Sequence, residues 1–364
     1  MLKSRLCIAF FAFAVGCAPA QKPLTDYVNP MLGTATLWDS VDLGFKPTKR
    51  TWGAEVFPGS SLPNAMVQVS PVTKFHSGAG YQYEDSVIYG FTHTNKGHWN
   101  LCHIPLLPVT GTPTPGDYCS PFSHERESAA PGYYQVFLDR YGVDAQLSST
   151  LRCAFHKYTY PAGAAPAVLA DLQRSNEHVR AWDIRKEGDN VFAGWQQTGE
   201  KMYFYAVANR PVTGIEPVVE GDREVRIVRF GEGDGALELR IGFSFVSEKN
   251  ARENLEAEML GKSFAEVRSE ATATWNDLLG RIRVEGGTER EKGLFYSSLY
   301  RSFLWPALRS DVNGEFTDVD GKVINPGFRY YTGPSYWDDY RNKLILLGLS
   351  LIHISEPTRL RCIS

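Results

Sequence analysis

Histidines at short spacings are the first residues of this sequence that could support chemistry. His93, His98 and His103 follow one another at intervals of five residues. Imidazole nitrogens are common metal ligands, but zinc sites usually combine one close pair of ligands with a more distant pair. This even spacing is therefore unusual for a metal site, and we do not expect these histidines to form one.

Carboxylates are the second candidate, because a pair of acidic groups can divide general acid and general base work. Glu125 lies two residues before Glu127, and Asp338 is followed directly by Asp339. Sequence proximity does not bring carboxylates together, since adjacent side chains of a strand point to opposite faces. The sequence by itself therefore assigns no catalytic pair.

Two short acidic segments, residues 311–314 and 318–321, resemble fragments of a calcium-binding loop. Both lack the further acidic ligands and the final glutamate of such a loop, so we expect hairpin turns there. The sequence contains no G-x-S-x-G nucleophile elbow, no phosphate-binding glycine loop and no C-x-x-C pair. No nucleophile, nucleotide site or zinc centre is predicted.

Composition points to a folded protein without a nucleic-acid partner. The 364 residues are 43% hydrophobic and 22% charged, and the formal net charge is −3. These values are typical of globular proteins and give no basic field for nucleic acid. The aromatic share of 13% suits stacking on sugar rings, although β-rich cores also favour aromatic residues. Both interpretations remain open.

The N-terminus predicts export. Residues 1–20 have a short positive region, an apolar stretch too short to span a membrane, and small residues near the end, which is typical of a signal peptide. Cleavage after Ala18-Pro19-Ala20, or before Cys17 in a lipobox-like segment, would both fit. We expect a periplasmic protein or an outer-membrane lipoprotein of a bacterium, whose only membrane contact is a lipid on Cys17. One disulfide among Cys102, Cys119 and Cys153 is possible, and the sequence does not choose the pair.

Residues 21–246 are predicted to form a large antiparallel β-sandwich. Apolar and polar residues alternate along Leu237–Phe245, and Met202–Ala206 behaves similarly. This period of two is typical of half-buried strands. Turn signals such as Glu187–Asn190 separate the segments, and no helices alternate with them, so a mainly β fold is expected.

The period changes to that of helices after residue 246. Residues 247–288 read as a helical linker, with one amphipathic helix over 248–279 and a strand-like segment over 281–284. A second helix is predicted over 289–304, ended by Pro306. A third is predicted over 337–347, with Leu344, Ile345 and Leu347 facing inward.

Six segments in order resemble glycoside hydrolase family 92, a family of α-mannosidases. The resemblance covers nearly all of residues 26–348. The segments are Val28-Asn-Pro-Met-Leu-Gly-Thr34, Phe57–Pro71, Gly80-Tyr-Gln-Tyr83 with Ile88–Thr94, Ala130–Tyr134 with the positions from Thr150 to Pro161, Phe295-Tyr-Ser-Ser-Leu-Tyr-Arg301, and Tyr336-Trp-Asp-Asp-Tyr-Arg341.

The resemblance implies an N-terminal β-sandwich packed on a C-terminal (α/α)6 barrel, with the active site between them. It further implies an inverting, calcium-dependent, exo-acting mannosidase, in which one carboxyl protonates the leaving oxygen and another activates water. The family's acid, base and most calcium ligands lie further into the barrel than this chain reaches. We therefore assign no catalytic residue, and we interpret residues 289–348 as the truncated start of the barrel.

The resemblance also implies six substrate-binding residues. Trp337, Asp338 and Arg341 match the family's Trp-Asp pair at the floor of the sugar site and an arginine one turn later. The loop Phe91–Asn100 matches the loop that grips the leaving sugar, with His93 kept. After His93 the segment departs from the pattern of α-1,2-mannosidases, which leaves the linkage specificity open. The remaining candidates of this loop are His98 and Trp99.

Residues 349–364 resemble a translated sequencing adapter, so we expect genuine sequence to end near Gly348. The leading hypothesis is a fragment of an exported α-mannosidase that removes terminal mannose from N-glycans or mannans. The alternative is a carbohydrate-binding β-sandwich module without catalysis, which best describes the literal chain.

Overall fold

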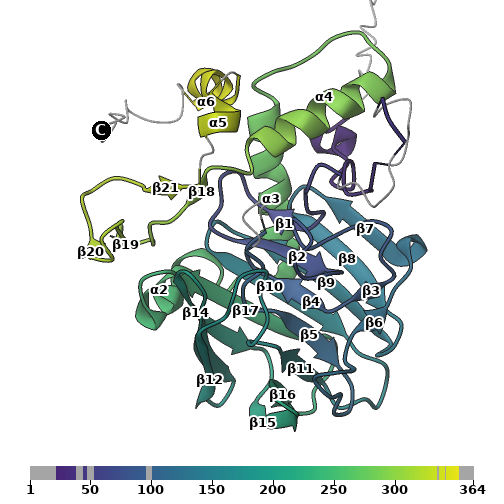
Figure 1. The fold of residues 1–364 in the computed structure, drawn as a ribbon, viewed down its shortest axis with the longest axis vertical. Coiled ribbons are helices and arrows are strands. Elements are labelled where there is room, and N and C mark those ends of the chain that lie inside the picture. Colours follow the sequence, from purple (N-terminus) through teal and green to yellow (C-terminus); the bar gives the residue numbers. More distant parts are fainter. Residues whose placement is uncertain are drawn as a thin grey trace, which may run out of the picture.

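The computed structural model describes residues 22–37, 44–46, 53–95, 101–333, 336–340 and 342–351. The predicted signal peptide with Cys17, the candidates His98, Trp99 and Arg341, and residues 352–364 of the predicted adapter segment lie outside them. Within the described residues, strands gather in the lower part of the molecule and helices α4, α5 and α6 lie above them (Figure 1). Among the described helices, none is long and apolar enough to cross a membrane.

One sheet has seven strands in the order β1-β2-β4-β5-β11-β16-β15, and all of its pairings are antiparallel. Strands distant in the sequence are neighbours here, because β11 lies between β5 and β16. Its strands are β1 (Ser60–Ser61), β2 (Gln68–Val72), β4 (Gly90–Thr92), β5 (Leu106–Val109), β11 (Ala167–Ala170), β15 (Val212–Glu220) and β16 (Arg223–Phe230).

The other large sheet has eight antiparallel strands in the order β12-β13-β14-β17-β10-β9-β8-β7. A separate short ladder joins β3 (Val87–Ile88) to β6 (Ser120–Pro121), and the 3-10 helix η2 (His124–Arg126) precedes β7. The strands of the large sheet are β7 (Glu127–Ala130), β8 (Tyr133–Leu138), β9 (Val143–Ser149), β10 (Cys153–Thr159), β12 (Ala181–Gly188), β13 (Val191–Gln197), β14 (Lys201–Ala208) and β17 (Leu237–Ser244).

The two sheets share one hydrophobic core, which contains residues from both. On β17, Leu237, Leu239 and Ile241 are buried in that core, while Glu238 and Arg240 point away from it. This is the alternation that the sequence predicted for a half-buried strand. The prediction of a mainly β fold with antiparallel sheets is confirmed.

The predicted single helix over 248–279 is wrong, because the chain forms two helices, α2 (Glu248–Glu258) and α3 (Phe264–Leu279). Gly261 has a φ of 91°, a conformation that glycine adopts readily and that a continuous helix does not allow. Ser263 then caps α3. Its hydroxyl accepts from the Glu266 N–H, and the Glu266 carboxylate accepts from the Ser263 N–H.

Both helices cover the outer face of the eight-stranded sheet. A small cluster beneath them joins Tyr133 and Phe155 of the sheet to Leu255 of α2 and Phe264 of α3. The second half of α3 packs instead with α4 (Glu289–Ser302) and the 3-10 helix η1 (Leu24–Tyr27) in a second core that includes Trp275. The helical region is therefore fixed to the sandwich on one side and to the N-terminal segment on the other.

The predicted strand over residues 281–284 is wrong, because these residues form no strand. Ile282 and Val284 are partly buried and pack against the second core. Two unexpected small ladders follow α4. Their strands are β18 (Ala307–Leu308) paired with β21 (Tyr331–Thr332), and β19 (Phe316–Thr317) paired with β20 (Val323–Ile324). The turns expected over 311–314 and 318–321 are confirmed, because Gly314 and Gly321 donate backbone hydrogen bonds to Asp311 and Asp318.

The predicted third helix is split into α5 (Tyr336–Asp339) and α6 (Lys343–Leu351). Leu347 packs against the second core as expected. The inward orientation predicted for Leu344 and Ile345 is wrong in this chain, because these side chains are 40% and 61% exposed. The apolar face of α6 is therefore only partly covered by the described residues.

Candidate functional site

The family-like segments converge where the sandwich meets α4 and the residues after it. At the N-terminal segment, the Asn29 N–H donates to the Ser297 hydroxyl at 2.9 Å. The Arg301 guanidinium donates to the Pro30 carbonyl at 3.3 Å. Two segments that are more than 260 residues apart in the sequence are thus held in direct contact.

Asn64 makes a second connection, from the segment Phe57–Pro71. Its N–H donates to the Phe303 carbonyl at 2.7 Å, and its side-chain amide donates to the Pro306 carbonyl at 2.8 Å. The Leu308 N–H returns a hydrogen bond to the Asn64 carbonyl at 2.9 Å. Since a single residue meets three backbone groups, the chain after α4 is tightly positioned on the sandwich.

Arg152, which directly precedes β10, makes a third connection between the sandwich and the residues after α4. Its guanidinium pairs with Glu258 at 2.6 Å, and both side chains are nearly buried. The same guanidinium donates to the Ser310 carbonyl at 2.8 Å. Because the nearly buried guanidinium donates to Glu258 of α2 and to the Ser310 carbonyl, it ties α2, the sandwich and residue 310 together.

The neighbouring Asp311 is a buried carboxylate that joins the same three parts. It accepts from the Ser244 hydroxyl at 2.7 Å, from Asn254 at 2.7 Å and from Asn250 at 2.9 Å. Burial raises the pKa of the Asp311 carboxyl, and the three donors act in the opposite direction. With its oxygens occupied by these donors, Asp311 positions the chain and is not placed to act as an acid or base.

The prediction that His93 contacts a sugar is wrong for its side chain. The ring is fully buried. Nδ1 lies 2.9 Å from the Ile104 carbonyl and Nε2 lies 2.9 Å from Nε2 of His156. Both ring nitrogens are therefore occupied inside the sandwich, where His93 links the two sheets.

His93 instead helps to fix the loop that carries His98 and Trp99. The His93 N–H donates to the His103 carbonyl, and the Cys102 N–H donates to the Thr94 carbonyl at 2.8 Å. Asn95, the last described residue before the loop, bonds to Gln68 through its N–H at 3.1 Å and its side chain at 2.7 Å. Both ends of the loop are thus anchored.

His103 is a buried residue whose structural role sequence reasoning did not identify. Its Nδ1 lies 2.7 Å from the Thr94 hydroxyl and its Nε2 lies 2.9 Å from the Thr198 hydroxyl. Burial lowers its pKa to about 3. No spacing signal could have found this site, because Thr198 is 95 residues away in the sequence.

The Trp337 side chain lies on α5 and is 88% exposed. An exposed indole face is suited to packing on the C–H face of a sugar ring. Asp338 lies next to it on the same short helix, so the two candidates share one element, whereas Arg341 lies outside the described residues.

Glu125 and Glu127 do not form a pair, as the sequence analysis expected. Glu125 is exposed, whereas the Glu127 carboxylate is buried. Glu127 accepts from the Tyr81 hydroxyl at 3.0 Å, from the Tyr134 hydroxyl at 2.5 Å and from His124 at 2.6 Å. Its lone pairs are thus used to connect the 80–83 segment to β8.

Within the described part of the chain, no group of three or more His, Cys, Asp or Glu side chains is arranged to hold a metal ion. Cys102, Cys119 and Cys153 are all free thiols, so the possible disulfide among them is not formed.

Comparison with known proteins matches both parts of the chain, the sandwich and the helical region that packs on it. The sequence model of the glycosyl hydrolase family 92 N-terminal domain matches residues 27–254. The model of the family 92 catalytic domain matches residues 250–359. The chain therefore belongs to glycosyl hydrolase family 92. The second match runs past Gly348 into the segment interpreted as adapter, and that interpretation stays a prediction.

Solved structures show the same fold. A family GH92 α-mannosidase from Bacteroides thetaiotaomicron is 26% identical with a TM-score of 0.81, over 90% of this chain and 47% of that one. The same enzyme is known in complex with mannoimidazole. A GH92 inverting mannosidase from strain VPI-5482 of that organism is 24% identical with a TM-score of 0.74, over 89% of this chain and 46% of that one; it supports the fold alone.

A curated relative from Arthroderma benhamiae, described as an uncharacterized secreted glycosidase, is 25% identical over 79% of this chain and 42% of its own length. The chain thus spans less than half the length of the relatives that it matches.

Proposed function

We propose that the whole protein is an exported, inverting, exo-acting α-mannosidase that removes terminal mannose from N-glycans or mannans. The observation that supports this most strongly is the match of both family 92 models in order along the chain. The mannosidase with a TM-score of 0.81 adds to it, since at 26% identity the likeness extends beyond the fold. The predicted signal peptide supports export.

The proposal divides the work between two parts. Residues 289–348 would begin an (α/α)6 barrel, and the barrel would carry the acid and the base. An inverting pair stands roughly 6.5–9.5 Å apart so that a water molecule fits between the base and the sugar. The residues of this chain would hold the sugar: Trp337 would pack on the ring, and Asp338 would accept hydrogen bonds from adjacent hydroxyls.

The leaving sugar would meet the loop with His98 and Trp99, whose two ends are fixed by Asn95 and Cys102. Calcium remains part of the proposal by family membership. When bound, it would polarise the sugar hydroxyls as a hard oxygen-seeking cation. By the same resemblance, most of its ligands would come from the barrel.

The role of Asp338 is tested by replacing it with alanine in the protein extended to the length of its relatives. We expect mannoimidazole affinity to fall at least about tenfold, since a carboxylate that accepts from a hydroxyl contributes roughly 1.5–3 kcal/mol. Isothermal titration calorimetry measures the affinity directly.

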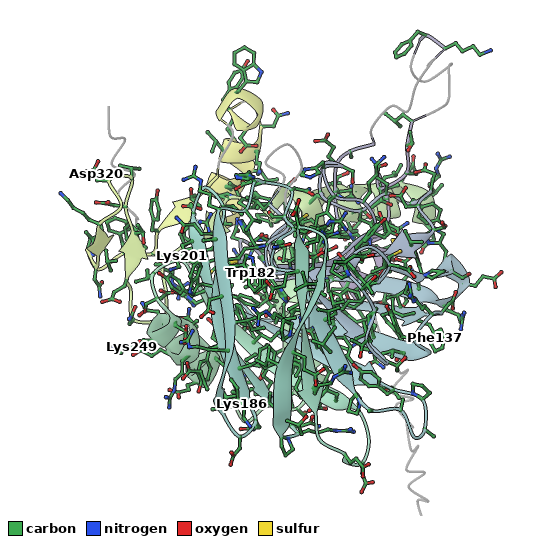
Figure 2. The ribbon with its side chains drawn as sticks, turned by 60° about the horizontal axis from the view of Figure 1, so that its bottom comes forward. Phe137, Trp182, Lys186, Lys201, Lys249 and Asp320 are labelled. Carbon is green, nitrogen blue, oxygen red and sulfur yellow. The ribbon has the colours of Figure 1, made fainter. Side chains whose placement is uncertain are left out.

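Asp320→Ala provides the matched control. Asp320 is an exposed carboxylate at the turn between β19 and β20, on the side that Figure 2 shows projecting from the sandwich. Its removal should leave the affinity unchanged. Equal affinity of Asp338→Ala and the unaltered protein would refute the proposed contact.

A further inference from the structure

A groove of about 600 Å³ lies between α3 and the outer face of the eight-stranded sheet. Gln146 of β9 and Lys157 of β10 form its floor, and one side of α3 forms its wall. The groove is open to solvent, because Ala265, Arg268 and Ser269 of its wall are exposed. The residues that line the wall are Phe264, Ala265, Arg268, Ser269, Thr272, Ala273 and Asn276.

The charged residues of this lining, Lys157 and Arg268, are both positive. In the described part of the chain, neither makes an ion pair or hydrogen bond through its side chain. The helix places no acid beside Arg268, because the residues three and four positions away on this face are Ala265, Phe264 and Thr272. The lining of the groove therefore carries two positive charges and no carboxylate.

The nearest acidic residues on the sheet are already occupied. Asp144 accepts hydrogen bonds from Gln135 at 2.8 Å and from Gln146 at 2.9 Å. Glu238 stands opposite Lys157 in the strand register, but its carboxylate bonds to Arg240 at 3.1 Å. On α3, Glu266 bonds to the cap and Glu270 pairs with Lys262.

Aromatic rings hold both cations in place without neutralising them. The Arg268 guanidinium carbon lies 3.6 Å from the centre of the Tyr133 ring, and the Lys157 ammonium lies 5.7 Å from the centre of the Phe264 ring. A guanidinium stacked on a ring keeps its in-plane N–H groups available to an oxyanion. Hydroxyl and amide groups of Ser269, Thr272 and Gln146 line the same groove.

We propose that this groove binds a glycan that carries sulfate or carboxylate groups. Arg268 would donate two parallel hydrogen bonds to the oxyanion, because its planar fork matches the spacing of the oxygens. Lys157 would add a second positive charge from the floor of the groove. The neighbouring hydroxyl and amide groups would bond to sugar hydroxyls, which a free inorganic anion does not have.

The test uses the full chain and three trisaccharide probes: trigalacturonate, a singly sulfated maltotriose, and neutral maltotriose. We expect both anionic probes to bind more tightly than the neutral one, and their relative affinity distinguishes carboxylate from sulfate. In the double variant Lys157→Gln/Arg268→Gln, we expect anionic-probe affinity to fall by about tenfold or more, since two charge-assisted contacts are lost. Calorimetry at a fixed salt concentration measures each affinity.

Two further variants make the result specific. Lys186→Gln/Arg290→Gln removes the same charge from exposed positions outside the groove, at the lower end of the strands in Figure 2 and on α4; it should bind like the unaltered chain. Lys157→Arg/Arg268→Lys keeps the charge but removes the guanidinium fork at residue 268, so its affinity for the anionic probes should lie between those of the unaltered chain and the double glutamine variant. The proposal is overturned if maltotriose or inorganic sulfate binds as tightly as the anionic sugars. Equal losses in the groove variant and the distant variant would also overturn it.

Discussion

At the scale of single residues, His93 and His156 form a chain of hydrogen bonds whose direction is fixed by its ends. The Ile104 carbonyl can only accept, so Nδ1 of His93 donates to it, and Nε2 of the neutral His93 ring accepts. His156 therefore donates from Nε2 and accepts at Nδ1 from the Tyr158 hydroxyl, 2.6 Å away. With both rings neutral, every ring nitrogen of the pair therefore has a partner of the opposite type.

The neutral histidines make stability depend on pH. Burial lowers the pKa of His93 and of His103 to about 3, from an ordinary value of 6.5, and lowers that of His156 in the same direction. Between these values the unfolded chain binds more protons than the folded chain. The free energy of unfolding should therefore fall as the pH drops below about 6.5, by up to roughly 1.4 kcal/mol per pH unit for each histidine.

Urea denaturation at pH 7 and pH 5 measures this slope. His103→Asn removes one of the buried histidines. The slope of the free energy of unfolding against pH should then fall by an amount that corresponds to about one proton, whatever the stability of the variant at pH 7. His178→Asn, at an exposed position, should leave the slope as it is. An identical slope in His103→Asn and the unaltered chain would show that His103 is not held neutral.

These residues also show where sequence reasoning fails. The type of His93 and its place in a family-like loop predicted a sugar contact, but its ring bonds to a histidine 63 residues away. A loop of known sequence does not reveal which of its side chains turn into the core. Glu125 and Glu127, by contrast, lie apart as the sequence analysis expected, because the Glu127 carboxylate is buried and Glu125 is exposed.

At the scale of elements, the approach of α2 to β17 depends on one glycine. A Cβ atom on Gly242 would lie 2.1 Å from the Ala251 carbonyl oxygen and 2.8 Å from the Leu255 Cβ. Both groups belong to α2, and Leu255 is fully buried. The missing side chain therefore allows the helix to pack directly on the strand and close the small core beneath it.

Gly242→Ala should destabilise the chain by about 2 kcal/mol or more, because a methyl group cannot fit against a backbone oxygen without moving the helix. Thermal denaturation followed by circular dichroism measures the loss. Gly214→Ala is the control, since that strand glycine has no neighbouring atom within 4 Å of a built Cβ. Comparable losses in the two variants would mean that α2 does not depend on close packing at residue 242.

Element type was easier to predict than element ends. The helical period over 248–279 was recognised, but the break at Gly261 was missed. Its signal was present in the sequence, because Ser263 and Glu266 have the spacing of a capping box. The short strands β18 to β21 gave no such signal, since two residues are too few for a periodic pattern.

At the scale of the whole molecule, periodicity predicted the sandwich but not its strand order. The position of β11 between β5 and β16, and the pairing of β10 with β17, depend on contacts between distant segments. Alternation identifies the buried face of a strand and does not identify its neighbour. The resemblance to a known family supplied what the pattern could not, because it placed the sandwich and the helices in one architecture.

The helical end of the molecule exposes apolar side chains that the sandwich does not cover. Trp337, Tyr340 and Ile345 are 88%, 57% and 61% exposed, and they come from the consecutive helices α5 and α6 and the turn between them. Adjacent exposed apolar groups favour association, whereas a single one on a polar surface does not. We therefore expect the chain of 364 residues to bind an apolar fluorescent dye and to self-associate.

Trp337→Ser/Ile345→Ser should reduce both the dye fluorescence and the apparent mass measured by light scattering, because it removes the two most exposed apolar groups of α5 and α6. Val219→Ser serves as the control, since Val219 is 64% exposed but lies alone on the polar edge strand β15. Its replacement should change neither signal. If dye binding is the same in all three proteins, the association surface lies elsewhere; if it falls only in the double variant, α5 and α6 form that surface.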